Sequence, residues 1–304
     1  MKKENEILCG DALEILKTFP DNSIDSCITS PPYYGLRDYG MAGQLGLERT
    51  YKEYITKLCD IFDQIKRVLK KKGTIWVNIG DSYSNQKVGN TETRIHKKAV
   101  QNSFKKEKQD IQEKSLIQIP TRFAIEMSNR GWILRNEIIW HKETCMPSSA
   151  TDRFTIDFEK IFFFVKNPNY YFEQQLEPYT EPMNRWGGNK LKATGESSWD
   201  LGTGQETYRD RDMRPNPEGR NKRAVWTINP KPFKEAHFAT YPEELIETPV
   251  KAGCPLGGII LDPFMGSGTT GLVAKKLNRK YLGIELNPEY IKIAENRLRQ
   301  EILL

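Results

Sequence analysis

The sequence is poor in features that mark several classes of protein. Only three of its 304 residues are histidines, and they are too scattered for a convincing metal site. Its five cysteines are unclustered and odd in number, which argues against a disulfide framework and favours a reducing compartment. No apolar run is long enough to span a membrane, and no apolar stretch near the N-terminus suggests a signal peptide. We therefore expect a cytoplasmic protein with no metal and no membrane partner.

The remaining composition favours one large core with an insertion. A chain of 304 residues has room for both, and it contains no internal repeat. The net charge of +6 and the isoelectric point near 8.9 are modest. Such a balance is expected of a protein that meets phosphate groups on one face only.

A glycine-rich turn follows an apolar run in the last sixth of the sequence. Residues 258–261 have the pattern of a buried parallel strand, and residues 269–277 have helical spacing. Gly266 and Gly268 lie between these segments and Gly271 lies in the second; together they match G-x-G-x-x-G, which suits a strand-to-helix turn that cradles a nucleotide. This unit predicts binding of the adenosine part of a cofactor.

The elements around this turn occur in an unusual order. Glu285 ends the next apolar strand, 280–284, where a ribose-binding carboxylate is expected. Beyond it there is only one amphipathic helix, 288–301, whereas a nicotinamide enzyme would need several more strand–helix units. The missing strands must precede the turn, and the patterns predict them at 7–9, 24–29, 74–79, 133–140 and 160–165, with helices at 12–19, 52–69 and 120–130.

Several segments together resemble the β-class DNA amino-methyltransferases. That family places a catalytic S/D/N-P-P-Y/F motif before a target-recognition region and an F-x-G-x-G cofactor motif last. The matching segments here are Thr29-Ser-Pro-Pro-Tyr-Tyr34, Gly10-Asp11 with 12–16, 73–83, 162–168, 236–244 and Ile260-Leu-Asp-Pro-Phe-Met-Gly-Ser-Gly-Thr-Thr270. The resemblance implies an α/β fold with a Rossmann-like seven-stranded sheet, a circularly permuted motif order and S-adenosylmethionine as cofactor.

The chemistry of Ser30-Pro31-Pro32-Tyr33 suits an exocyclic amine as substrate. The lone pair of such an amine is conjugated with its ring, so acceptors for both amino hydrogens are needed to aim it at a methyl group. The Ser30 hydroxyl and the Pro31 carbonyl supply two acceptors from a turn that two prolines hold rigid. Tyr33 offers a face for stacking an extruded base. Pro-Pro-Tyr alone also occurs in ordinary loops.

The resemblance also implies a set of cofactor-binding residues, several of which have a simpler structural explanation. Asp11 is equally well the N-cap of its helix, and Asp262 is suited to capping the turn that follows it. Glu285 could instead be a surface charge, and the two aromatic residues could instead be ordinary core residues. The expected set is Asp11, Phe238, Asp262, Phe264, Gly266, Ser267, Gly268, Thr269 and Glu285.

Two polar stretches do not fit the sheet. Residues 86–115 carry eight Lys/Arg against four Asp/Glu, which is typical of a mobile basic arm along DNA phosphates or of a solvated insertion. Residues 177–223 are rich in Gly, Arg and Asn and occupy the place of a target-recognition region; the alternative is a long surface loop. Candidate DNA contacts are Tyr34 and Arg37, which alternatively only order the catalytic loop, and Arg185, Trp186, Arg209, Arg211 and Arg214.

We therefore expect a catalytic half at 1–176, a target-recognition region at 177–223 and a cofactor-binding half at 224–304. The expected activity is methyl transfer to N4 of a flipped cytosine in double-stranded DNA, because Ser at the first motif position is associated mainly with cytosine in the family. Adenine N6 is the near alternative, and a non-catalytic DNA-binding protein the distant one. A bacterial, archaeal or phage source, a cognate restriction endonuclease, and a monomer or homodimer are further expectations.

Overall fold

The computed structural model describes residues 4–84, 110–145, 147–179, 216, 218–230 and 241–300. The chain divides into two compact units, one of Met1–Glu173 with Ala224–Leu304 and one of Gln174–Arg223. The expected divisions, after residues 176 and 223, lie close to these limits. The first unit contains the sheet and the two motifs of the expected site.

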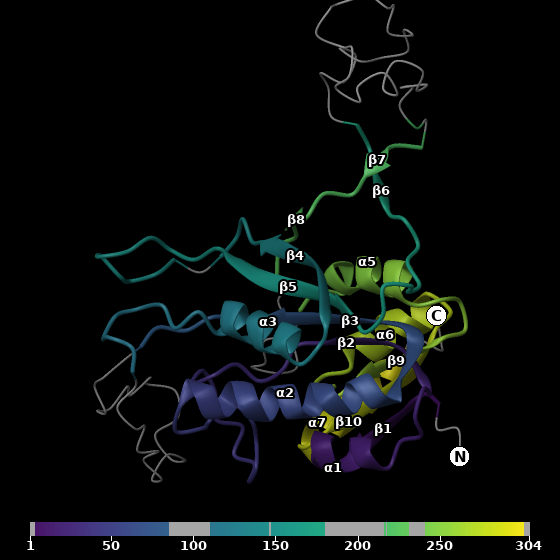
Figure 1. The fold of residues 1–304 in the computed structure, drawn as a ribbon, viewed down its shortest axis with the longest axis horizontal. Coiled ribbons are helices and arrows are strands. Elements are labelled where there is room, and N and C mark those ends of the chain that lie inside the picture. Colours follow the sequence, from purple (N-terminus) through teal and green to yellow (C-terminus); the bar gives the residue numbers. More distant parts are fainter. Residues whose placement is uncertain are drawn as a thin grey trace, which may run out of the picture. The chain divides into compact units, whose positions relative to one another are not determined.

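The first unit is built on an eight-stranded sheet (Figure 1). Its strand order is β1-β10-β9-β2-β3-β5-β4-β8. All neighbouring strands are parallel except those paired with β5, which runs against β3 and β4. The strands are β1 (Glu6–Cys9), β2 (Ile24–Thr29), β3 (Leu69–Ile79), β4 (Ile133–His141), β5 (Phe158–Val165), β8 (Val225–Thr227), β9 (Ile259–Asp262) and β10 (Lys280–Glu285).

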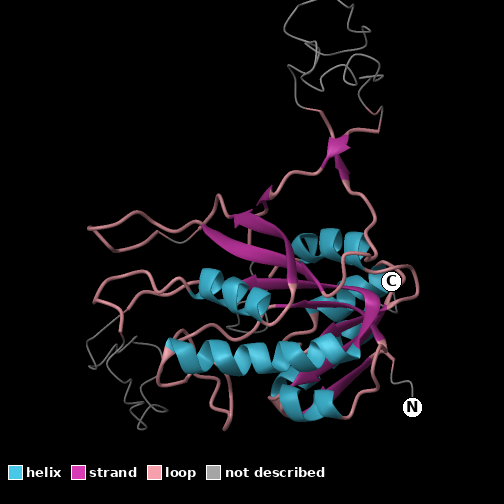
Figure 2. Cartoon of the chain, in the orientation of Figure 1, coloured by secondary structure: helices cyan, strands magenta, loops and turns pink. Residues whose placement is uncertain are grey.

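Helices cover both faces of this sheet, so the unit has three layers (Figure 2). One apolar core lies between the sheet and α1 to α3, and a second lies between the sheet and α5 to α7. The helices are α1 (Ala12–Lys17), α2 (Tyr51–Val68), α3 (Ile119–Asn129), α5 (Glu243–Gly253), α6 (Thr269–Lys276) and α7 (Pro288–Gln300).

The longest helix, α2, shows how the sequence sets these layers. The Thr50 hydroxyl accepts a hydrogen bond from the Glu53 N–H and caps its first turn. Tyr54, Leu58 and Ile65, at helical spacing, are completely buried against the sheet. Burying such a side chain contributes about 1.5–3 kcal/mol, so the apolar stripe fixes which face of α2 meets the core.

The expected α/β architecture with a mostly parallel sheet is present, but the sheet has eight strands where seven were expected. All seven expected strands are present. The additional strand, β8, has three residues and extends the sheet by parallel pairing with β4, Ile139 opposite Val225. Helix α5 was also not anticipated; it contains Pro249, a residue that disfavours helix interiors.

The strand order brings the two key turns together. β2 and β9 are neighbours, with Ser26 opposite Ile260 and Cys27 opposite Leu261. The chain leaves β2 toward β3 on one side and leaves β9 toward β10 on the other. In open α/β sheets a crevice forms at the carboxyl ends of strands where the connections diverge in this way. The residues that follow these two strands, Ser30 and Pro263, therefore lie at this crevice.

The second unit contains a two-stranded antiparallel sheet of β6 (Leu176–Glu177) and β7 (Arg220–Asn221). The Glu177 carboxylate accepts hydrogen bonds from the guanidinium groups of Arg220 (2.9 Å) and Arg223 (2.6 Å). Residues 180–215 of this unit lie outside the described residues.

Candidate active site

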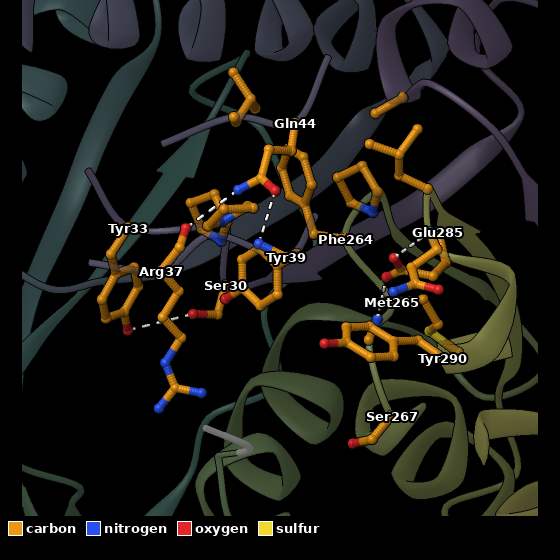
Figure 3. A pocket seen from close by; sticks show the side chains of 18 of the residues that line it. Ser30, Tyr33, Arg37, Tyr39, Gln44, Phe264, Met265, Ser267, Glu285 and Tyr290 are labelled. Carbon is orange, nitrogen blue, oxygen red and sulfur yellow. Dashed lines mark hydrogen bonds between the residues drawn. The ribbon is translucent and has the colours of Figure 1, made fainter. Parts of the chain in front are cut away.

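A cavity of about 460 Å³ lies at the carboxyl ends of β2 and β9. Ser30, Pro31, Pro32 and Tyr33 of the catalytic turn line it, and so does the glycine turn. In Figure 3, Ser30 and Tyr33 lie on one side of the cavity, and Glu285 and Tyr290 lie on the other. The structure thus brings together two motifs that are more than 230 residues apart, in a space of the size that small ligands occupy.

The catalytic turn is held by side chains outside the motif. The Tyr54 hydroxyl on α2 donates to the Pro32 carbonyl at 2.8 Å. The Thr29 hydroxyl donates to Asp262 Oδ1 at 2.6 Å and so ties the end of β2 to the end of β9. With two fixed proline φ angles, these bonds leave Ser30 little freedom to move relative to the cofactor side.

Tyr33 is anchored at its hydroxyl and backed at its ring. The hydroxyl lies 2.5 Å from Glu159 Oε2 and 3.0 Å from Asn78 Oδ1. Its ring lies against Gly80, where a Cβ atom would come within 2.5 Å of the ring atom Cε2. Burial and then the charge of Glu159 raise the pKa of Tyr33 well above 10, so the phenol remains a hydrogen-bond donor.

A pair of charged side chains completes this side of the cavity, one at the end of β4 and one on β5. The Lys142 ammonium group forms an ion pair with Glu159 Oε1 and lies 4.1 Å from the centre of the Trp140 ring. The Asn78 amide donates to Glu159 Oε2 at 3.0 Å. These four residues line the cavity, and none belongs to the set expected from the sequence.

The glycine turn has the geometry of a nucleotide cradle. Gly266 has φ +51°, and its N–H donates to Glu285 Oε2 at 2.8 Å. The other oxygen of Glu285 accepts from the Asn287 N–H at 2.8 Å. An ionised carboxylate has about four acceptor positions, so positions remain for hydroxyl groups of a ligand. Burial is the main cause that raises the pKa of Glu285 above 4.5.

The remaining residues of this turn divide into lining and packing positions. Ser267 and Thr269 line the cavity, and Arg297 on α7 donates to both of their hydroxyl oxygens, at 2.9 and 3.1 Å. Gly268 does not line it. Its φ is +83°, and a Cβ atom would lie 2.9 Å from the Cβ of Ala294. Gly268 is therefore required by the close approach of α7 and not by contact with a ligand.

Asp262 does not line the cavity as the expected cofactor contact would. Its side chain is 1% exposed, and four protein donors reach it: the hydroxyls of Thr29, Thr270 and Tyr241 and the Phe264 N–H. Burial raises its pKa above 3.8. The alternative of a turn cap describes Asp262 better, and the cap also connects β2, α6 and Tyr241.

Tyr34 also lies elsewhere than expected. Its side chain is 3% exposed in the core beside Tyr54, with ring centres 5.6 Å apart, so it orders the catalytic loop and does not face DNA.

Arg37 lines the cavity. Asp11 caps α1 by accepting from the Glu14 N–H at 3.0 Å and also lines the cavity, and Phe264 both lines it and packs against the core.

An aromatic contact that no sequence pattern indicates lies at the cofactor side. Tyr39, from the loop after the catalytic turn, meets Tyr290 on α7 edge to face, with ring centres 6.2 Å apart. The Gln44 side chain orders this loop by accepting from the Tyr39 N–H at 2.8 Å and donating to the Arg37 carbonyl at 3.1 Å. All four residues line the cavity.

Several expected site residues lie outside the described residues. These are residues 86–109 of the basic stretch, and Arg185, Trp186, Arg209, Arg211, Arg214 and Phe238. Within the described part of the chain, no group of His, Cys, Asp and Glu is arranged to hold a metal ion. No helix there is both long and apolar enough to cross a membrane. All five cysteines are free thiols, and burial raises the pKa of Cys59 and of Cys254 to about 12.

Residues 24–296 match a family model described as DNA methylase, of the N6/N4 type. The chain is 40% identical over 296 residues to the Type II methyltransferase M.Cfr9I of Citrobacter freundii, covering 96% of this chain and 87% of that protein. It is 37% identical over 294 residues to the Type II methyltransferase M.SmaI of Serratia marcescens, covering 96% of this chain and 90% of that protein.

Two solved structures share the fold. The PvuII DNA methyltransferase (cytosine-N4-specific) superposes with a TM-score of 0.65 at 19% identity, over 98% of this chain and 87% of that one. The protein TTHA0409 of Thermus thermophilus, in complex with S-adenosyl-L-methionine, superposes with a TM-score of 0.62 at 23% identity, over 98% of this chain and 94% of that one.

Proposed function

Since the chain belongs to the N6/N4 DNA methylase family and is a DNA methyltransferase, we propose that it methylates the N4 amine of a cytosine flipped out of double-stranded DNA. The observation that carries the proposal is the shared cavity. Ser30 and Tyr33 stand on one side and the glycine turn with Glu285 on the other. A nucleophile held at the first group and a methyl donor held at the second would meet within this space.

The cofactor side suits S-adenosylmethionine. Glu285 keeps free acceptor positions for the two ribose hydroxyls, and Gly266, which has no side chain and a positive φ, lets the backbone approach a ligand closely. Asp11, Phe264, Ser267 and Thr269 would surround the adenosine and methionine parts. Bound there, the cofactor supplies an electrophilic methyl group next to the catalytic turn.

The residues of the catalytic turn would orient the amine. The two amino hydrogens donate to the Ser30 hydroxyl oxygen and the Pro31 carbonyl, which directs the nitrogen lone pair at the methyl group. The base stacks on Tyr33, a contact worth about 1–3 kcal/mol. Alignment of this kind reaches effective molarities of about 10⁵ M or more, so a covalent enzyme–base intermediate is not required.

The choice of base rests on Ser30, which is associated mainly with cytosine at this motif position in the family. Adenine N6 is the second candidate, because the same acceptors would orient its amine. We assign recognition of the DNA sequence to residues 177–223 and phosphate contacts to the basic stretch 86–115 and Arg37. Since the similar M.Cfr9I and M.SmaI are named Type II methyltransferases, a restriction endonuclease of the same specificity is the expected partner.

The test is mass spectrometry of nucleosides from unmethylated DNA incubated with the protein and S-adenosylmethionine. We expect N4-methylcytosine from the wild type and none from Ser30→Ala, while calorimetry shows that both bind the cofactor. N6-methyladenine would overturn the choice of base. Absence of any methylated base, with cofactor bound, would overturn the proposed activity.

A further inference from the structure

The hydrogen bonds that start at Ser30 end on a carboxylate. Ser30 Oγ lies 3.3 Å from the Tyr33 hydroxyl oxygen, which lies 2.5 Å from Glu159 Oε2. A phenol has one proton, and the shorter contact assigns it to Glu159. The Tyr33 oxygen is then an acceptor for the Ser30 proton, and the lone pairs of Ser30 are available to the substrate amine.

From this geometry we propose that Glu159, acting through Tyr33 and Ser30, is the terminal acceptor of the proton that the amine loses during methyl transfer. The inference rests on the proposed transfer to an exocyclic amine. It gives Tyr33 a second role besides stacking, one that needs its hydroxyl group and that a phenylalanine would not fulfil.

The proton balance of the step is simple. The amine nitrogen bonds to the methyl carbon while the bond from that carbon to sulfur breaks, and its electron pair stays on sulfur. The nitrogen, left with one proton too many, passes it to Ser30 Oγ, Ser30 passes its own proton to Tyr33, and Tyr33 passes its proton to Oε2 of Glu159. No oxidant, reductant or further reactant is needed.

The contacts of Glu159 indicate which of its oxygens takes part. Oε1 is paired with Lys142, so Oε2 is the oxygen that receives the proton. The Glu159 side chain is 19% exposed, which lets the proton leave to solvent after the reaction. Asn78 Oδ1, 3.4 Å from Ser30 Oγ, competes for the Ser30 proton but is an amide oxygen and a poor base, so it does not carry the proton further.

The experiment compares Glu159→Gln, Tyr33→Phe and the double variant in single-turnover methylation at saturating cofactor and DNA. In the first variant the new amide oxygen still accepts from the Tyr33 hydroxyl but is too weak a base to take its proton. In the second the phenyl ring keeps the stacking face. We expect each single change to lower the rate about a hundredfold, the scale of general base catalysis, and the double variant to be no slower. The dissociation constants for cofactor and DNA should stay within twofold.

The matched control is Glu137→Gln on β4, which also removes a carboxylate paired with a lysine, Lys160 at 2.6 Å, but does not line the cavity. It should react at the wild-type rate. A wild-type rate for Glu159→Gln, or losses that multiply in the double variant, would overturn the proton path. If Glu159→Gln does not fold, a wild-type rate for Tyr33→Phe alone would do so. A wild type that methylates no amine would instead overturn the proposed function.

Discussion

The contact between Gly80 and the Tyr33 ring makes a quantitative prediction for Gly80→Ala. The added Cβ would lie 2.5 Å from Cε2 and 2.8 Å from Cδ2 of that ring, whereas ordinary contacts between carbon atoms begin near about 3.5 Å. Gly80 is not among the positive-φ glycines, so the substitution brings steric overlap without backbone strain. The ring must therefore move away from residue 80 by about 1 Å.

A displacement of about 1 Å in a positioning residue can cost roughly a hundredfold in rate. We expect Gly80→Ala to lower the single-turnover rate by about that factor, with an unchanged cofactor dissociation constant because the glycine turn is not touched. The matched control is Gly73→Ala on β3, whose Cβ would lie 2.5 Å from Leu69 Cγ and which does not line the cavity. That variant should lose stability and keep its rate. A wild-type rate for Gly80→Ala would refute the view that Gly80 sets the position of Tyr33.

Two further predictions concern the cofactor side. At Gly268 φ is +83° and an added Cβ would lie 2.9 Å from Ala294, whereas at Gly266 φ is +51° and the nearest atom is 3.9 Å away. Urea denaturation should therefore show that the free energy of unfolding falls by about 2–4 kcal/mol in Gly268→Ala and by only about 1–2 kcal/mol in Gly266→Ala. The reverse ranking would contradict the packing argument. The folded-state pKa of Asp262 is raised above 3.8, so its contribution to stability is complete below that pH and is lost as the pH rises through the folded-state pKa. As the pH rises from that value, the free energy of unfolding of the wild type, measured with urea, should therefore fall relative to that of Asp262→Asn. Parallel pH profiles for the two proteins would show that the pKa of Asp262 does not change on folding.

The sequence predicted those parts of the fold that have strong local signals. Helix α2 buries an apolar stripe along 18 residues, and the glycine turn has a spacing that few other structures require. By contrast, β8 has only three residues and becomes a strand by pairing with β4, which no local pattern reveals. Helix α5 likewise contains Pro249, a residue that disfavours helix interiors, so its local sequence does not predict a helix.

The same division applies to the site. Ser30, Tyr33, Gly266 and Glu285 stand in motifs that the sequence displays, and all four line the cavity. Lys142 and Glu159 were not predicted, because each is one charged residue near a strand end and they converge only once β4 and β5 pair.

Tyr34 and Asp262 show the limit of motif reasoning in the other direction. Both lie in the right segments, yet both side chains are buried in the protein, at 3% and 1% exposure. Burial of this kind depends on the completed packing of the fold, so a motif read from the sequence does not reveal it.

The adjacency of β2 and β9 also bears on how the protein is made. The contact between Thr29 and Asp262 spans 233 residues of sequence, so it closes a very long loop whose entropic cost is about 5 kcal/mol in a simple polymer estimate. When strands β1 to β5 of a growing polypeptide have emerged from the ribosome, the chain still lacks β9, the strand that completes the centre of its sheet. Until β9 arrives, the edge of β2 is open to mispairing with other chains. Methylating activity therefore requires residues 259–285, which are synthesised late in translation.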